Sequence, residues 1–191
     1  MTWWSKRWPR ALEALGLSYP DNRLVRARAL IRGGAVDDLL VSPGEITAWV
    51  DYPRKTFGVS LRVPVLDEAA WAAESGRIAA RVGSLAALLD DRLPEDMLSL
   101  FPGEGELAVE CPCGRGLCVH VVVVHLAFAD LFEEDPFLLP LLRGRGREEL
   151  LAGVRAAMPP VPEAGPPVGV AVGDVDVAGF FDGDREGLSA W

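Results

Sequence analysis

The residues most able to do chemistry lie between Cys111 and His120, where three cysteines and one histidine follow the order C-x-C-x4-C-x-H. They include all three cysteines of the chain and one of its two histidines. Thiolate sulfur and imidazole nitrogen are the usual ligands of tetrahedral structural zinc. The spacing therefore predicts one zinc ion bound by Cys111, Cys113, Cys118 and His120.

Three other interpretations of this segment are open from the residues alone. The cysteines could be buried free thiols beside an incidental histidine. A disulfide would leave one thiol unpaired, and joining Cys111 to Cys113 would strain the short ring. A catalytic zinc would need an open position for water and an acid or base such as Glu110, whereas four protein ligands already complete the usual shell.

The residues around these ligands suit a compact metal-binding turn. Gly114 and Gly116 lie between the two ligand pairs, where tight turns favour residues that tolerate positive φ. Residues 106–110 alternate in polarity, which predicts a short strand that ends at the first ligand pair. His125, five residues beyond the histidine ligand, is expected to be a structural or surface histidine rather than a fifth ligand.

The pattern C-x-C followed by C-x-H resembles the SWIM zinc finger, and the flanking residues resemble the bacterial SWIM zinc finger proteins. The inner loop, Gly114–Leu117, is shorter than is usual in that family, and Val119 stands where a basic residue is common. The segments that carry the resemblance are Trp3-Trp4, Arg23–Val63, Leu98–Pro102, Phe132–Leu139, Leu141–Arg145 and Arg147–Leu150.

The resemblance implies a zinc ion on the same four ligands and a helix from about Val119. The residue types alone would instead favour a strand over Val121–Val124, because valine has a high β-propensity. The resemblance also implies binding of nucleic acid or protein, often in association with a Swi/Snf-type helicase.

Alternation of apolar and polar residues predicts an antiparallel β-meander over 36–63, with turns at Ser42–Gly44 and Tyr52–Lys55. A small sheet of this kind needs cover on its apolar face. Helical spacing of apolar residues between Ile78 and Leu89 predicts the stripe that covers the sheet. The expected fold class is therefore α+β, with a small antiparallel meander covered by helices and followed by a SWIM-type strand-loop-helix zinc knuckle.

Helices are expected through the region 67–100. Asp67 is a suitable N-cap for the first, Gly76 is expected to interrupt it, and Pro94 is expected to open a further short helix. Two short helices after the zinc knuckle are predicted at 138–142 and 148–158.

Three regions are expected along the chain. Residues 1–100 form an N-terminal α+β region with a basic start rich in tryptophan and arginine, and residues 101–158 form the zinc finger and the helices after it. Residues 159–191 begin with a Pro/Gly-rich linker and continue as an acidic and apolar segment.

Charge bears on the question of nucleic acid. The formal net charge is −9, whereas affinity for nucleic acid comes largely from Lys and Arg that displace counterions from phosphate. The N-terminal tryptophans and cations could clamp a single strand, or they could pack on the domain or on a partner protein. The candidate residues for contact with nucleic acid or a partner are Trp3, Trp4, Lys6, Arg7, Arg10, Arg115, Arg143, Arg145 and Arg147.

Enzymatic chemistry finds little support in the sequence. The phosphate-binding motif G-x-x-x-x-G-K-[ST], the motif G-x-G-x-x-G and the nucleophile elbow G-x-S-x-G are all absent from the printed sequence. The start lacks an apolar signal segment, and cysteines in a metal pattern suit a reducing cytoplasm. We therefore expect a cytoplasmic, non-enzymatic zinc adaptor that serves a DNA-associated complex, with a Swi/Snf-type helicase as partner and direct DNA binding as the alternative.

Overall fold

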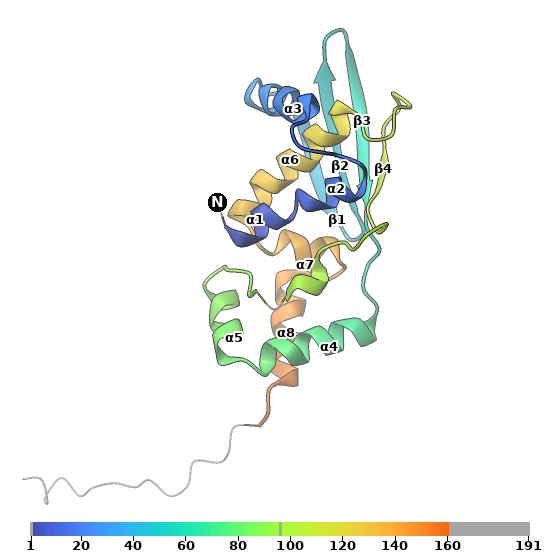
Figure 1. The fold of residues 1–191 in the computed structure, drawn as a ribbon. Helices are drawn as coiled ribbons and strands as arrows, with labels where there is room; N and C mark the ends of the chain where they lie inside the picture. Colours follow the sequence, from blue (N-terminus) through green and yellow to red (C-terminus); the bar gives the residue numbers. More distant parts are fainter. Residues whose placement is uncertain (1, 96, 161–191) are drawn as a thin grey trace, which may run out of the picture. The chain divides into compact units, whose positions relative to one another are not determined.

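The computed structural model of the protein describes residues 2–95 and 97–160. Within them, the chain up to Pro159 forms one compact unit, in which helices lie along one side of a small sheet and beyond its end (Figure 1). The predicted acidic and apolar segment after the Pro/Gly-rich linker lies outside the described residues.

The four strands form one antiparallel sheet in chain order, β1-β2-β3-β4. This confirms the predicted meander and the short strand before the metal ligands. A tight turn joins β1 to β2, where Gly44 adopts a φ of +82° that an L-residue rarely takes. The strands are β1 (Val36–Ser42), β2 (Glu45–Tyr52), β3 (Lys55–Arg62) and β4 (Ala108–Glu110).

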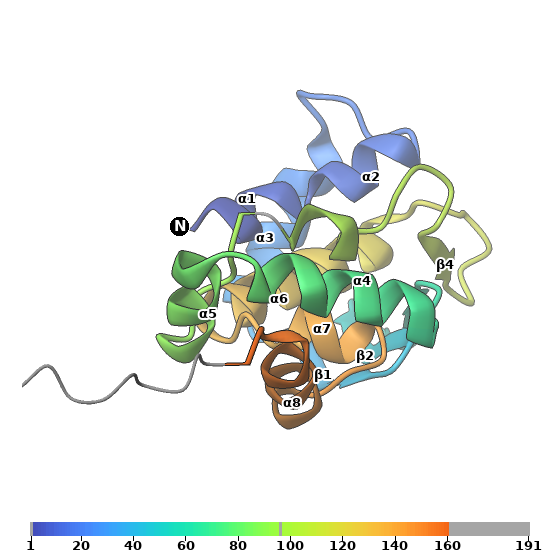
Figure 2. The ribbon, with the colours of Figure 1, turned by 90° about the horizontal axis from the view of Figure 1, so that it is seen from below.

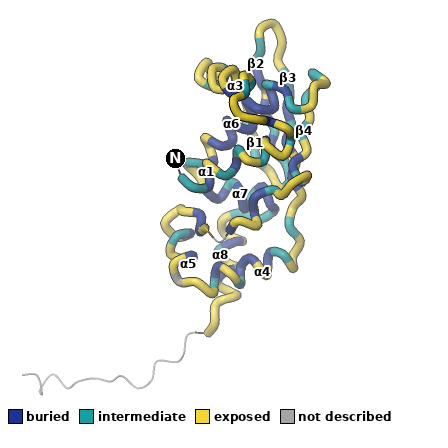
Figure 3. The backbone as a smooth tube through the Cα atoms, in the orientation of Figure 1, coloured by how far each residue is buried: buried dark blue, intermediate teal, exposed yellow. Residues whose placement is uncertain are grey.

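Helix α6 (Val119–Glu134) covers one face of the sheet, and it confirms the helix implied by the resemblance. It contacts β1, β2 and β3 as well as the N-terminal helices α1 (Trp3–Arg7) and α3 (Asn22–Arg32). Val121–Val124 are consequently all fully buried (Figure 3). Burial of these four side chains outweighs the low helix propensity of valine, which costs only about 0.5 kcal/mol per residue relative to alanine.

The helices of region 67–100 do not provide this cover, so the expectation for the stripe Ile78–Leu89 was wrong. Helix α4 (Glu68–Ala79) packs instead against α5 (Val82–Leu89) and the C-terminal helix α8 (Arg147–Ala157). These elements gather beyond the end of the sheet in Figure 1, and in the view from below they lie in front of it (Figure 2). An apolar stripe predicts that a helix face will be buried but does not identify the surface that buries it.

Helix α4 starts as predicted and ends later than predicted. The Asp67 side chain accepts a hydrogen bond from the Ala70 backbone N–H and caps the helix. Gly76 does not interrupt the helix, which continues to Ala79. An interior glycine costs only about 1 kcal/mol relative to alanine, and burial of Trp71 and Ile78 on the same helix outweighs that cost.

The remaining elements are short. Pro94 precedes a 3-10 turn rather than an α-helix, and the two helices predicted after the knuckle are present. None of the described helices is long and apolar enough to cross a membrane. The short elements are α2 (Arg10–Ala14), η1 (Met97–Leu100) and α7 (Leu138–Leu142).

Candidate metal centre

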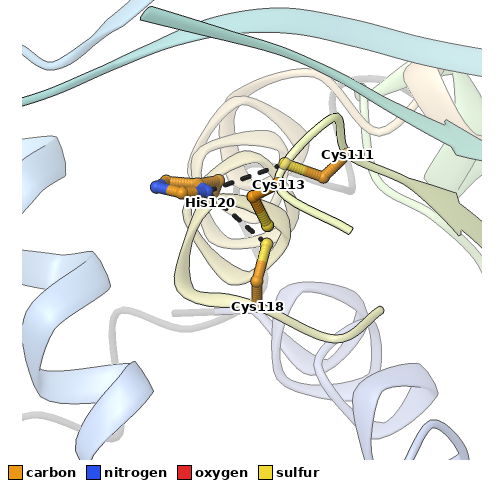
Figure 4. Close-up of side chains that lie close together, drawn as sticks. All are labelled: Cys111, Cys113, Cys118 and His120. Carbon is orange, nitrogen blue, oxygen red and sulfur yellow. Dashed lines mark hydrogen bonds between the residues drawn. The ribbon is translucent and has the colours of Figure 1, made fainter. Parts of the chain in front are cut away.

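The four predicted ligands come together at the start of α6. Cys111 and Cys113 lie in the loop that follows β4, Cys118 is the N-cap residue of α6, and His120 lies in its first turn. Their ligand atoms all lie within 4.8 Å of one another, and the side chains point toward a common centre (Figure 4). The structure thus positions Cys111, Cys113, Cys118 and His120 to hold a metal ion.

The spacing of the ligand atoms suits a tetrahedral ion. The Nδ1 atom of His120 lies 3.6 Å from the Sγ atoms of both Cys111 and Cys118. Zinc–sulfur bonds of about 2.3 Å and zinc–nitrogen bonds of about 2.05 Å at tetrahedral angles place sulfur and nitrogen about 3.6 Å apart. These two separations are consistent with zinc, and Nδ1 is the imidazole nitrogen that faces the thiols.

Local backbone geometry produces this convergence. Gly114 and Gly116 adopt φ values of +71° and +55°, so the four-residue loop Gly114–Leu117 can reverse direction between the two ligand pairs. The Gly114 N–H donates to the Cys111 carbonyl at 3.1 Å, and the Cys118 N–H donates to the Gly116 carbonyl at 2.8 Å. These two bonds close the turn and aim its thiols inward.

Aromatic side chains from the β2–β3 hairpin hold the imidazole of His120. The Phe57 ring stacks on it with centroids 4.0 Å apart, and the Tyr52 ring meets it edge-on at 4.9 Å. The Nε2 atom of His120 is buried and has no hydrogen-bond partner among the described residues. Ring packing therefore fixes the orientation of this ligand, in place of the hydrogen bond that commonly supports a metal-bound histidine.

Burial controls the protonation of the ligands before metal binds. Burial raises the pKa of the Cys111 thiol to about 12 and also raises the pKa of the Cys118 thiol. Burial also opposes ionisation of Cys113, but the Arg115 backbone N–H and the neighbouring thiols bring its pKa below the ordinary value. Burial lowers the pKa of His120, which keeps the imidazole neutral and able to bind a metal.

The cluster offers four protein ligands, the number that a structural zinc site uses. These ligands would complete a tetrahedral shell around an ion, and all three cysteines are free rather than joined in a disulfide. Glu110, the nearest acid in sequence, forms an ion pair with Arg62 at 3.0 Å. His125 lies outside the cluster; its Nε2 atom is 3.2 Å from the Trp8 carbonyl, and burial lowers its pKa to about 3.

Arg23 connects the metal-binding loop to α3, a contact that the sequence did not predict. Its guanidinium donates to the Leu117 carbonyl at 2.6 Å and pairs with the Asp21 carboxylate at 2.5 Å. Asp21 is also the N-cap of α3, where its side chain accepts a hydrogen bond from the Arg23 N–H. The local sequence D-N-R predicts such a cap, but nothing local indicates contact with a carbonyl 94 residues away.

The N-terminal tryptophans pack inside the protein. The Trp3 Nε1–H donates to the Leu93 carbonyl at 3.0 Å, and the Trp4 Nε1–H donates to the Phe132 carbonyl at 2.9 Å. Arg7 lies 5.8 Å from the centroid of the Phe101 ring, while Lys6 and Arg10 are exposed. Packing on the domain, one of the two interpretations left open above, is what the structure shows for Trp3 and Trp4.

The arginines after α7 lie in ion pairs within the unit. Arg143 is buried and pairs with Glu106 at 3.4 Å. Arg145 pairs with Glu68, and Arg147 pairs with Asp91. The structure brings only Arg115, of the nine predicted contact residues, to the metal centre, where it lines the same pocket as Cys113 and His120.

The chain is similar to the uncharacterized protein Rv2102 of Mycobacterium tuberculosis (strain ATCC 25618 / H37Rv), with 37% identity over 168 residues. The matched region covers 82% of this chain, which spans 60% of the length of that relative. No protein-family model matches the chain. No solved structure matches it either.

Proposed function

We propose that this chain is a structural-zinc protein in which one zinc ion joins the loop after β4 to the start of α6. The observation that carries the proposal is the equal 3.6 Å separation of His120 Nδ1 from two thiol sulfurs. That separation is compatible with a zinc ion that binds its ligands at tetrahedral angles. Zinc would stabilise the knuckle against the hairpin and α3, because binding free energy at such a site is also folding free energy.

We further propose that the knuckle is of the SWIM type and that the protein is a cytoplasmic, non-enzymatic adaptor. Its partner would be a Swi/Snf-type helicase within a DNA-associated complex. The C-x-C and C-x-H ligand pairs and the helix that begins at Val119 support this assignment. The closed ligand shell supports a structural rather than a catalytic role for the ion.

Metal analysis of the purified protein tests the zinc proposal. We expect about one zinc per chain in the wild type and little in a Cys113→Ser/Cys118→Ser variant. A His125→Gln variant is the matched control, since it changes a histidine on α6 outside the ligand cluster, and it should retain zinc. A folded wild-type protein whose thermal unfolding and metal content do not respond to zinc or chelator would refute the proposal.

Affinity purification from native lysate tests the adaptor proposal separately. The tagged wild type should recover a Swi/Snf-type ATPase, and the Cys113→Ser/Cys118→Ser variant should recover less. Absence of any such ATPase from zinc-loaded wild-type samples, relative to a tag-only control, would refute the helicase partner without affecting the zinc site.

A further inference from the structure

A pocket that includes the ligands Cys113, Cys118 and His120 in its wall is also lined by cations and aromatic rings. It has a volume of about 700 Å³ and is formed by α3, the β2–β3 hairpin and the metal-binding loop. Ligand pockets in proteins commonly measure about 300–1,000 Å³, so this one can receive a group of nucleotide size. Its basic side chains are Arg23, Arg26, Lys55 and Arg115.

Three of these cations are available to a ligand. Arg26, Lys55 and Arg115 are exposed, and none has an ion pair to a residue in the described part of the chain. Arg23 differs, because Asp21 and the Leu117 carbonyl already occupy its guanidinium. The pocket therefore presents positive charge from three separate elements, together with one arginine, Arg23, that is held by its own partners.

This local charge contrasts with the chain as a whole. The net charge is −9, and the acidic residues outnumber Lys and Arg by 28 to 19. No aspartate or glutamate lines the pocket. An anionic ligand is thus attracted to this place on a protein whose net charge is negative.

Aromatic rings stand among the cations. Tyr52 and Phe57 line the pocket and are half-buried. One face of Phe57 stacks on His120, and the Lys55 ammonium lies 5.0 Å from its centroid. Tyr52 touches His120 only edge-on, so its ring is the better placed of the two for stacking on a ligand.

We propose that this pocket binds a single-stranded nucleic acid, with Arg26, Lys55 and Arg115 on its phosphates and the Tyr52 ring against an unstacked base. Cations that follow a backbone and aromatic rings that stack on bases are the two features of single-strand binding surfaces. An acidic peptide would use the cations but would have no planar base for the ring. The inference goes beyond the adaptor role and rests on the proposed zinc only for the position of Arg115 in the loop.

Charge balance at the metal is the competing explanation for these cations. Zinc with three thiolates and a neutral imidazole carries a net charge of about −1, since the ligands must be deprotonated thiols and neutral histidine. Nearby cations would then serve zinc affinity alone. The two explanations differ in what is lost when the cations are removed: strand binding in one case and zinc in the other.

Fluorescence anisotropy with labelled 12-nucleotide DNA and RNA single strands across 50–200 mM salt tests the proposal on the zinc-loaded full chain. The site variant is Arg26→Ala/Lys55→Ala/Arg115→Ala. The charge-matched control is Arg28→Ala/Arg32→Ala/Arg155→Ala, which removes three exposed cations outside the pocket. Each single-strand phosphate contact contributes a slope of about 0.7 in log affinity against log salt, so the site variant should lose a slope of about 2.

The site variant should also bind the strand at least about tenfold more weakly at 50 mM salt, as expected for several lost phosphate contacts, while the control stays within about twofold. A Tyr52→Leu variant should weaken binding by about 5- to 150-fold, the range for one stacked base, while Tyr52→Phe keeps it. Zinc content should remain about one per chain in the site, control and Tyr52→Phe variants, and Tyr52→Leu is compared at full zinc loading because Tyr52 also packs on His120.

Several results would overturn the proposal. These are no strand binding by zinc-loaded wild type at 50 mM salt, equal losses in site and control variants, or competition by poly-glutamate as effective as that by unlabelled strand. Loss of zinc from the site variant would assign its cations to charge balance at the metal and would also overturn it. A wild type that binds the strand without taking up zinc would instead refute the proposed metal and leave the pocket assignment standing.

Discussion

Zinc binding should release protons in a number that the structure allows us to estimate. Burial raises the pKa of Cys111 to about 12 and that of Cys118 above its ordinary value, so both thiols are protonated near neutral pH without metal. The pKa of Cys113 is lowered and that of His120 is also lowered. Because zinc binds thiolates and neutral imidazole, its binding must remove two protons from Cys111 and Cys118 and up to one more from Cys113.

The number of protons released sets the pH dependence of affinity. Two to three protons correspond to a rise in apparent zinc affinity of about 100- to 1,000-fold per pH unit near neutrality, since each proton contributes about 1.4 kcal/mol per unit. The sign follows from the thiols: the metal-free site holds more protons than the bound site, so affinity increases as pH rises. Neutral His120 contributes no proton at pH 7.

Calorimetric titration with zinc in buffers of different ionisation enthalpy measures this number directly at pH 7. The wild type should release two to three protons, and a Cys111→Ser variant should release one fewer with weaker binding. A His125→Gln variant is the control and should match the wild type. Release of one proton or none by the wild type would refute the assignment of three thiol ligands.

Two further predictions concern the surroundings of the site. Arg23→Ala should lower the free energy of unfolding of the zinc-loaded protein, measured in urea, by about 1 kcal/mol, because the Leu117 carbonyl loses a charged donor. The control Arg92→Ala removes an exposed pair with Asp90 and should have no measurable effect. Equal losses of stability in the two variants would contradict the role of Arg23. His125 should stay neutral in NMR titrations to about pH 4, since burial lowers its pKa to about 3. In the unfolded chain His125 is protonated below about pH 6.5. Acidification to pH 5.5 should therefore lower the stability of the wild type by about 1.4 kcal/mol more than that of His125→Gln. Identical pH dependence of stability in the two proteins would refute this prediction.

Local signals in the sequence were sufficient for several elements. The apolar alternation and the turn at Ser42–Gly44 predicted the meander, because strand period and turn chemistry depend on adjacent residues. The Asp67 cap was predicted for the same reason. Residue propensity did not predict helix α6, since Val121–Val124 favour a strand when considered alone. Only the family resemblance implied this helix.

The identity and spacing of the metal ligands were determined by the sequence itself, because all four lie within one short segment whose glycines permit the turn. Only the tertiary structure decided what surrounds them. Packing selected α6 rather than the stripe Ile78–Leu89 as the cover of the sheet. It also joined Arg23 to the knuckle and gathered cations from three elements into one pocket. Each of these depends on contacts between residues far apart in the chain, and burial against a distant partner leaves no local pattern from which that partner can be identified.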